Sequence, residues 1–343
     1  MKDLNDIGFE NYEPGLPGTP DLTKLKSKQG VTWLQFRETL TPKYHIVWRD
    51  VAICYFLIIL GIVLSIYTET KSGLFITIPV TIISGLWIGY WFHSLSLFLH
   101  EAVHYLIHKD KKMNDILTDV IICPFIFIDT AGYRKIHWQH HTNLGTTKDT
   151  EKSYFNALSP RFILESLTGI HAVRTLLVYF SPDNHTDHKE KTLSEKIKGF
   201  DFKKALRLIV SQSIVLLILV LFGKYFTAIA WIIGIVIFWP FLGSLRQILR
   251  HRGEYTSVKV DYYKTDQGAF LRMFGDDLFS KSFGAAGFNK HMLHHWDPHV
   301  SYTRLDDMEK FMLSTELGPI IDSGRTSYKN VFFKLLKQGL GDE

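Results

Sequence analysis

Residues 51–92, VAICYFLIILGIVLSIYTETKSGLFITIPVTIISGLWIGYWF, decide the fold, because two apolar runs enclose the short polar connection TETKS. The runs cover residues 51–67 and 73–92, and neither contains a charged side chain. A helix of about 20 apolar residues crosses a bilayer core of about 30 Å. Each run is near that length, so the stretch predicts two transmembrane helices joined by a tight connection.

A second pair of apolar runs lies further along the chain. LIVSQSIVLLILVLF occupies residues 208–222, and FTAIAWIIGIVIFWPFL follows at 226–242 after the connection GKY. With extension at their ends, the four runs predict transmembrane helices at about 50–68, 73–92, 206–223 and 226–246. The sequence therefore predicts an all-α integral membrane protein with four helices in two hairpins.

The distribution of basic residues predicts the orientation. Nearly all Lys and Arg lie in 1–49, 93–207 and 246–343, and the positive-inside rule places these stretches in the cytoplasm. We expect a cytoplasmic N-terminal arm with an interfacial helix at 1–49, a membrane domain at 50–310 and a cytoplasmic C-terminal tail at 311–343. The polar start of the sequence lacks the apolar segment of a signal peptide. A bacterial inner membrane is the expected location, and the endoplasmic reticulum is the alternative.

Composition narrows the function further. Hydrophobic residues make up 46% of the chain, which favours membrane lipids as its surroundings. The net charge is +5, and the basic residues form no concentrated stripe, so nucleic acid is not an expected partner. The only cysteines, Cys54 and Cys123, lie inside apolar stretches. This excludes a disulfide framework, a zinc ribbon and an iron–sulfur cluster within the chain.

Histidine is the unusual component, since eight of the 16 histidines fall into three groups: HEAVH at 100–104, HWQHH at 137–141 and HMLHH at 291–295. Spacings of three and four residues gather the imidazoles on one side of a helix. His251, which follows the last apolar run, is a ninth candidate. The candidate metal ligands are His100, His104, His137, His140, His141, His251, His291, His294 and His295.

Burying so many neutral imidazoles without partners is costly, and a metal provides the partner. One ion takes three or four protein ligands, so eight or nine histidines indicate two ions. Imidazole suits iron, zinc, copper and nickel. The number of ligands and the membrane setting favour two irons used for O₂ chemistry. Asn114, Asp115, Asn289 and Asp297 are candidate partners of the ligand N–H groups, and Trp138 and Trp296 are candidate walls of a substrate channel.

Two other functions fit parts of the pattern. His100-Glu101-x-x-His104 is also the HExxH signature of zinc proteases, with Glu101 as general base. That interpretation leaves both HxxHH groups and His251 unexplained. A histidine-rich metal transporter would place its ligands at mid-membrane, whereas these histidines lie beyond the predicted helix ends.

The sequence resembles the membrane fatty acid desaturase superfamily over roughly residues 50–310. The resemblance is carried by HEAVHYLIHKDKKMNDIL, YRKIHWQHHTNLGTTKDTE and FNKHMLHHWDPHVSYTRL, and by the spacing between them. It implies a four-helix anchor, a cytoplasmic cap holding two irons, and the nine histidines as ligands. It further implies an enzyme that uses O₂ to introduce a double bond into a fatty acyl chain or other lipid. Lipid or carotenoid hydroxylases and ketolases share these motifs and remain alternatives.

The chain departs from the superfamily at one position near the site. Relatives often have Arg-x-x-x-Glu-His before the third group, whereas this chain has Arg246-Gln-Ile-Leu-Arg250-His251. It also has no His-Pro-Gly-Gly segment of a fused cytochrome b5 domain, and no flavin or nicotinamide signature. The resemblance therefore implies an external electron carrier such as ferredoxin, cytochrome b5 or rubredoxin.

Overall fold

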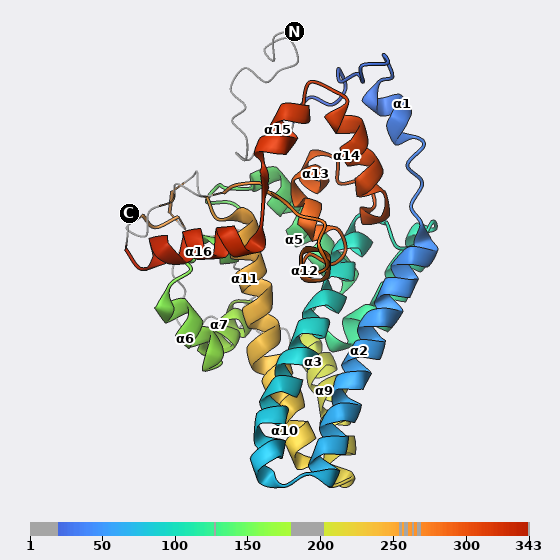
Figure 1. Cartoon of the computed structure of the whole chain (residues 1–343). Coiled ribbons are helices and arrows are strands. Elements are labelled where there is room, and N and C mark those ends of the chain that lie inside the picture. The colour runs from blue at the N-terminus through green and yellow to red at the C-terminus, as the bar shows by residue number, and fades with distance from the viewer. Residues whose placement is uncertain are drawn as a thin grey trace.

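Three long helical rods dominate this computed structural model (Figure 1). They are α2 (Tyr44–Lys71), α3 (Leu74–Val103) and a continuous rod of α10 (Tyr225–Ile233), the π-helical segment η5 (Gly234–Phe238) and α11 (Trp239–His251). The structure describes residues 20–126, 128–179, 202–253, 256, 260–262, 264–265 and 269–341. Residues 1–19 of the predicted N-terminal arm lie outside these ranges.

Within the described residues, three helices are long and apolar enough to cross a membrane: Tyr44–Lys71, Leu74–Val103 and Tyr225–His251. They correspond to the first, second and fourth predicted crossings. The third corresponds to α9 (Phe202–Leu221), whose apolar part, Ile209–Leu221, is shorter. Lys111–Phe125 and Thr130–Asn143 pass the same test only as a pair, and this pair is bent by 92°. The described residues therefore contain three candidate spans, and the fourth crossing remains a proposal.

Small residues let the rods approach closely. A Cβ added to Gly89 of α3 would lie 2.6 Å from Phe238 Cβ and 2.7 Å from the Gly234 carbonyl oxygen. Gly85, one turn earlier, meets Ile233 and Ala230 in the same way. Contacts between small residues are typical of helix pairs in membranes, where they bring backbones together. This packing fixes α3 against α10 and η5.

A carboxylate joins two of the rods at the end away from the histidines. Glu69, near the end of α2, accepts hydrogen bonds from the backbone N–H groups of Phe226 (3.0 Å) and Thr227 (3.1 Å). These N–H groups belong to the first turn of α10, which has no intrahelical acceptors for them. Glu69 therefore caps α10 from a neighbouring helix, which explains a charged residue in the connection TETKS.

Shorter elements follow α3 and cover the end of the rods. They are α4 (Lys111–Leu117), η2 (Thr118–Ile122), η3 (Cys123–Phe125), α5 (Thr130–Asn143), η4 (Lys152–Phe155), α6 (Pro160–Leu167) and α7 (Ile170–Tyr179). The chain leaves α3 through Tyr105, whose φ of 62° lies in the left-handed region. Arg134 of α5 holds this exit, because it donates to the carbonyl oxygens of Val103 (2.9 Å) and Ala102 (3.2 Å) and lies over the Tyr105 ring.

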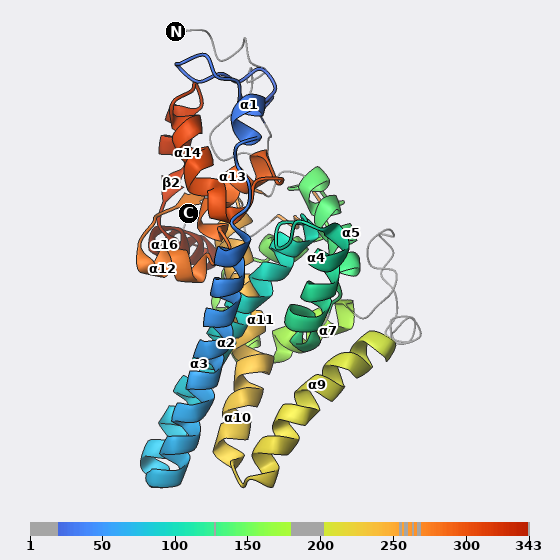
Figure 2. The same cartoon turned by 90° about the vertical axis from the view of Figure 1, so that its right-hand side faces the viewer.

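The C-terminal part of the chain packs against the N-terminal segment (Figure 2). Its elements are β1 (Met273–Phe274), α12 (Leu278–Phe283), η6 (Phe288–Lys290), α13 (His291–Trp296), η7 (Tyr302–Arg304), α14 (Leu305–Leu313), α15 (Gly318–Ser323), β2 (Arg325–Thr326) and α16 (Tyr328–Gly339). β1 and β2 pair in parallel. The predicted tail at 311–343 thus contains α15, β2 and α16, with Tyr328, Val331 and Leu335 in a core that includes Phe274 and Leu249.

Within the described part of the arm predicted at 1–49, the short helix α1 (Trp33–Arg37) lies in the stretch where an interfacial helix was expected. Trp33 is buried and packs against Phe311, with ring centroids 5.4 Å apart. Its indole N–H donates to Asp297 (3.0 Å), and Arg37 forms an ion pair with the same carboxylate (3.2 Å). The N-terminal segment is therefore fastened directly behind α13.

The glycine packing gives a stability prediction. We expect Gly89→Ala to destabilise the protein by about 1–3 kcal/mol, because the new methyl group overlaps the Gly234 carbonyl oxygen. Gly243→Ala in α11 is the control, since its Cβ would meet only His93 Cδ2 at 3.9 Å. Thermal unfolding in detergent measures both. Equal midpoints for the two variants would show that the contact is not tight.

Candidate metal centre

Four helices bring the nine candidate histidines together. His100 lies in the last turn of α3 and His104 is its C-cap residue, while His251 ends α11. His137, His140 and His141 lie on α5, and His291, His294 and His295 lie on α13. Each helix thus presents histidines at its end or along one side, at the place where all four helices meet.

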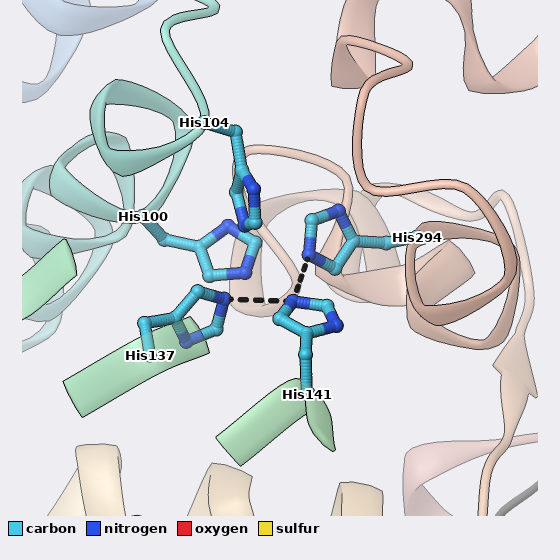
Figure 3. Close-up of side chains that lie close together, drawn as sticks. All are labelled: His100, His104, His137, His141 and His294. Atoms are coloured by element: carbon cyan, nitrogen blue, oxygen red, sulfur yellow. Dashed lines mark hydrogen bonds between the residues drawn. The ribbon is translucent and has the colours of Figure 1, made fainter. Parts of the chain in front are cut away.

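The first histidine cluster contains His100, His104, His137, His141 and His294, and one ring nitrogen of each lies within 4.8 Å of the others. Figure 3 shows these five rings pointing toward one another from α3, α5 and α13. His141 Nε2 lies 3.0 Å from His137 Nε2 and 3.1 Å from His294 Nε2. This arrangement surrounds one small volume with imidazole nitrogens.

The second histidine cluster contains His140, His251, His291 and His295, all of them buried. His291 Nε2 lies 3.1 Å from His251 Nε2 and 2.9 Å from His295 Nε2. The two clusters adjoin, because the rings of His141 and His295 are 4.5 Å apart. The nine histidines therefore form two neighbouring groups of ring nitrogens.

Unpartnered nitrogens are the observation that tests whether a metal fits. Within the described part of the chain, neither ring nitrogen of His100 or His104 has a hydrogen-bond partner, and neither do His140 Nε2 and His291 Nδ1. Leaving a buried polar group unpaired costs about 1–3 kcal/mol. Burial also lowers the pKa of His294 and His295 well below the usual value, with a further contribution from neighbouring histidines. These imidazoles are neutral at pH 7, the form that binds metal ions.

Two carboxylates that the sequence interpretation did not single out contact the histidines from behind. Asp149, fully buried, lies 2.9 Å from His140 Nδ1 and also accepts from the Tyr154 hydroxyl. Glu151 lies 2.8 Å from His137 Nδ1 and accepts from Tyr133. With Nδ1 bonded to a carboxylate, each ring keeps its Nε2 for the cluster. The signal was present in the acidic end of the second motif, KDTE.

The four polar residues predicted behind the histidines form hydrogen bonds elsewhere. Asn114 donates to the Ala102 carbonyl (2.8 Å), and Asp115 pairs with Arg134 (2.6 Å), so both hold the exit of α3. Asn289 donates to the Gly275 carbonyl (3.2 Å), and Asp297 binds Trp33 and Arg37. They support the segments that carry the histidines, and none of their described hydrogen bonds reaches a cluster ring.

The two predicted channel residues lie in different surroundings. Trp138 contacts the first cluster, with its ring 5.1 Å from His104 and 5.7 Å from His141. Trp296 is 3% exposed and belongs to the core formed with Leu22, Leu25 and other residues around α14. Trp138 is therefore the better candidate for a wall beside the cluster.

Comparison with known proteins adds the family. The sequence profile of the family described as fatty acid desaturase matches residues 76–316, more than two thirds of the chain and a range that contains every histidine of both clusters. Among curated proteins, none matches the chain significantly. Because the family profile covers most of the sequence, the chain belongs to the fatty acid desaturase family.

Proposed function

We propose that this chain is an O₂-dependent di-iron membrane oxidase that introduces a double bond into a fatty acyl chain or another lipid. The observation that carries the proposal is the division of nine histidines into two adjoining clusters of five and four. Two such clusters match the need for two metal ions, each with three or more imidazole ligands. Family membership supports iron and a lipid substrate.

In this proposal His100, His104, His137, His141 and His294 hold one ion, and His140, His251, His291 and His295 hold the other. When bound, the irons supply the O₂-dependent oxidation of an unactivated C–H bond. Desaturation removes two hydrogens from adjacent methylene groups and reduces O₂ to two waters, with two electrons and two protons from outside. The electrons come from an external carrier such as ferredoxin, cytochrome b5 or rubredoxin.

The residues of the chain orient the ligands and keep water out. Asp149 and Glu151 accept the Nδ1 protons of His140 and His137, so the Nε2 atoms point into the clusters. Phe288 packs on His100 and His291, with ring centroids 4.4 and 5.0 Å apart, and covers one side of both clusters with an apolar face. A site closed in this way limits side reactions with water.

The location follows from the candidate spans. Three apolar helices and the family support a membrane protein. Four crossings, with both termini and the histidines on the cytoplasmic side of a bacterial inner membrane, are the proposed arrangement. His100 and His104 lie at the end of α3, and His251 ends α11. A lipid acyl chain then reaches the clusters from the bilayer.

Hydroxylation or ketone formation on a lipid or carotenoid is the nearest alternative, because both reactions begin with the same hydrogen removal. A zinc protease fits the arrangement less well. Glu101 would have to activate a metal-bound water, yet its carboxylate accepts from the backbone N–H of Tyr302 (3.2 Å) and the Ser301 hydroxyl (3.4 Å). The HExxH interpretation also provides no role for the second histidine cluster.

The metal assignment predicts the effect of removing one ligand from each cluster. We expect the purified protein to contain about two irons per chain, and His294→Ala and His140→Ala each to lose about one or both. Elemental analysis after anaerobic reconstitution measures the content. His45→Ala, at an exposed position, is the control and should keep both. One zinc and no iron in the unmodified protein would contradict the proposal.

The reaction predicts a change in cell lipids. We expect expression of the chain with a suitable electron carrier to produce new unsaturated acyl chains, and His294→Ala to abolish them, because the first cluster is then incomplete. Mass spectrometry of total lipids detects the products. Hydroxylated lipids or oxidised carotenoids without new double bonds would instead support the alternative reaction.

The hydrogen bond between Asp149 and His140 predicts a partial loss of metal affinity when the carboxylate is removed. We expect Asp149→Asn to weaken metal binding by about 10–100-fold, because the amide no longer accepts the Nδ1 proton with a negative charge. Metal titration of the reconstituted protein measures the affinity. Asp322→Asn, at an exposed position, should leave it unchanged. Unaltered affinity in Asp149→Asn would show that this carboxylate does not orient His140.

A further inference from the structure

Two buried arginines lie one ring away from the histidine clusters. Arg246 and Arg250 are on α11 and are 7% and 1% exposed. Their guanidinium carbons lie 4.2 and 4.4 Å from the centre of the Phe288 ring. Since Phe288 also packs on His100 and His291, a single phenyl ring contacts both cations and one histidine of each cluster.

The hydrogen-bond donors of these arginines are incompletely used. Within the described ranges, Arg246 Nη1 and the Nε and Nη1 of Arg250 have no hydrogen-bond partner. Arg272, which is equally buried, shows the ordinary situation, because it donates to the carbonyl oxygens of Leu249, Arg250 and Arg252. Buried guanidinium groups normally find such acceptors. The unused donors of Arg246 and Arg250 therefore indicate a missing acceptor.

Two neighbouring side chains add further donors. Arg246 Nε donates to His93 Nε2 (2.8 Å), so the remaining proton of a neutral His93 is on Nδ1. That Nδ1 and the hydroxyl of Tyr328 have no partner among the described residues. His93 and Tyr328 are linked by Phe283, whose ring lies 5.6 Å from the first and 5.0 Å from the second. The unpartnered groups thus belong to one neighbourhood.

The charges of this neighbourhood do not balance. Glu151 interacts electrostatically with both arginines, but its oxygens already accept from Tyr133 and Gln247 and contact His137. One carboxylate therefore faces two guanidinium groups, which do not lose their protons. Metal ions in the clusters would add positive charge. Buried cations require opposite charges nearby, so an anion completes the arrangement.

We propose that Arg246, Arg250, His93 and Tyr328 form a binding site for a carboxylate. The planar fork of an arginine matches a carboxylate with two parallel hydrogen bonds. The position beside Phe288 suits the acid group of a lipid whose chain continues toward the histidine clusters. The substrate is then a free carboxylic acid and not its ester or thioester, an assignment that rests on the proposed function. A small carboxylate from solvent is the other source of the same chemistry.

The test is equilibrium binding of radiolabelled hexadecanoate to the purified full-length chain, in competition with unlabelled hexadecanoate, its methyl ester or acetate. We expect the unlabelled acid to compete at least tenfold better than the ester. Acetate that competes as well as hexadecanoate would support the carboxylate site and assign it to a solvent anion. An ester that competes as well as the acid would overturn the proposal.

Variants assign the binding to these residues. Arg250→Glu places a carboxylate four residues from Arg246, where the two pair on the helix, and should weaken hexadecanoate binding at least tenfold. Tyr328→Phe keeps the ring packing, removes one donor and should weaken binding several-fold. Arg161→Gln, whose side chain is 81% exposed, is the control. Unchanged binding in both Arg250→Glu and Tyr328→Phe would overturn the assignment.

The measurement needs neither metal nor turnover. If the di-iron proposal is wrong, the metal content will contradict it while acid binding remains. If the carboxylate site is wrong, the competition experiment will contradict it while the metal content remains.

Discussion

Lone pairs on imidazole nitrogens repel one another at about 3 Å unless a proton or a cation lies between them. The chain gathers nine imidazoles into two clusters whose ring nitrogens lie within 4.8 Å of one another, and four pairs of these nitrogens are 2.9–3.1 Å apart. The rest of the structure holds the rings there. The rods are fixed by close glycine contacts between α3 and η5 and by Glu69 at the far end. Arg134, Asp149 and Glu151 then hold the segments and rings around the clusters. In the proposed function, the attraction of metal cations for these nitrogens would make the arrangement favourable.

Much of the site could be predicted from residue spacing. Residues four apart lie on one face of a helix, so His137 and His141 belong to one cluster, as do His291 and His295. His140 and His294 lie elsewhere around their helices. His140 of α5 joins the cluster of His291 and His295, and His294 of α13 joins the cluster of His137 and His141. Spacing predicts which two histidines of each helix share a cluster. The cluster that the third histidine joins depends on how α5 and α13 pack against each other, which is a tertiary property.

Other features depend on contacts that no local pattern encodes. Asp149 and Glu151 follow α5 in an irregular segment, and only its path back toward His140 and His137 makes their carboxylates partners. Hydropathy predicted three of the candidate spans, because long apolar runs are a strong signal. It was less informative for α9, whose apolar part is short. The C-terminal helices α15 (GPIIDS) and α16 (YKNVFFKLLKQG) are short and mix apolar with polar residues, so their packing was not evident from hydropathy alone.

The contacts between the N-terminal segment and Asp297, directly after α13, affect the order in which the protein folds. Trp33 and Arg37 bind Asp297, and the clusters combine residues from His100 to His295. Contacts between such distant positions form late, because long loops must close first. During synthesis from the N-terminus, the first two histidine motifs emerge before any complete cluster exists. Because both clusters include residues of α13, neither is complete until α13 has left the ribosome. The metal ions of the proposed function would therefore enter only after most of the chain has been synthesised.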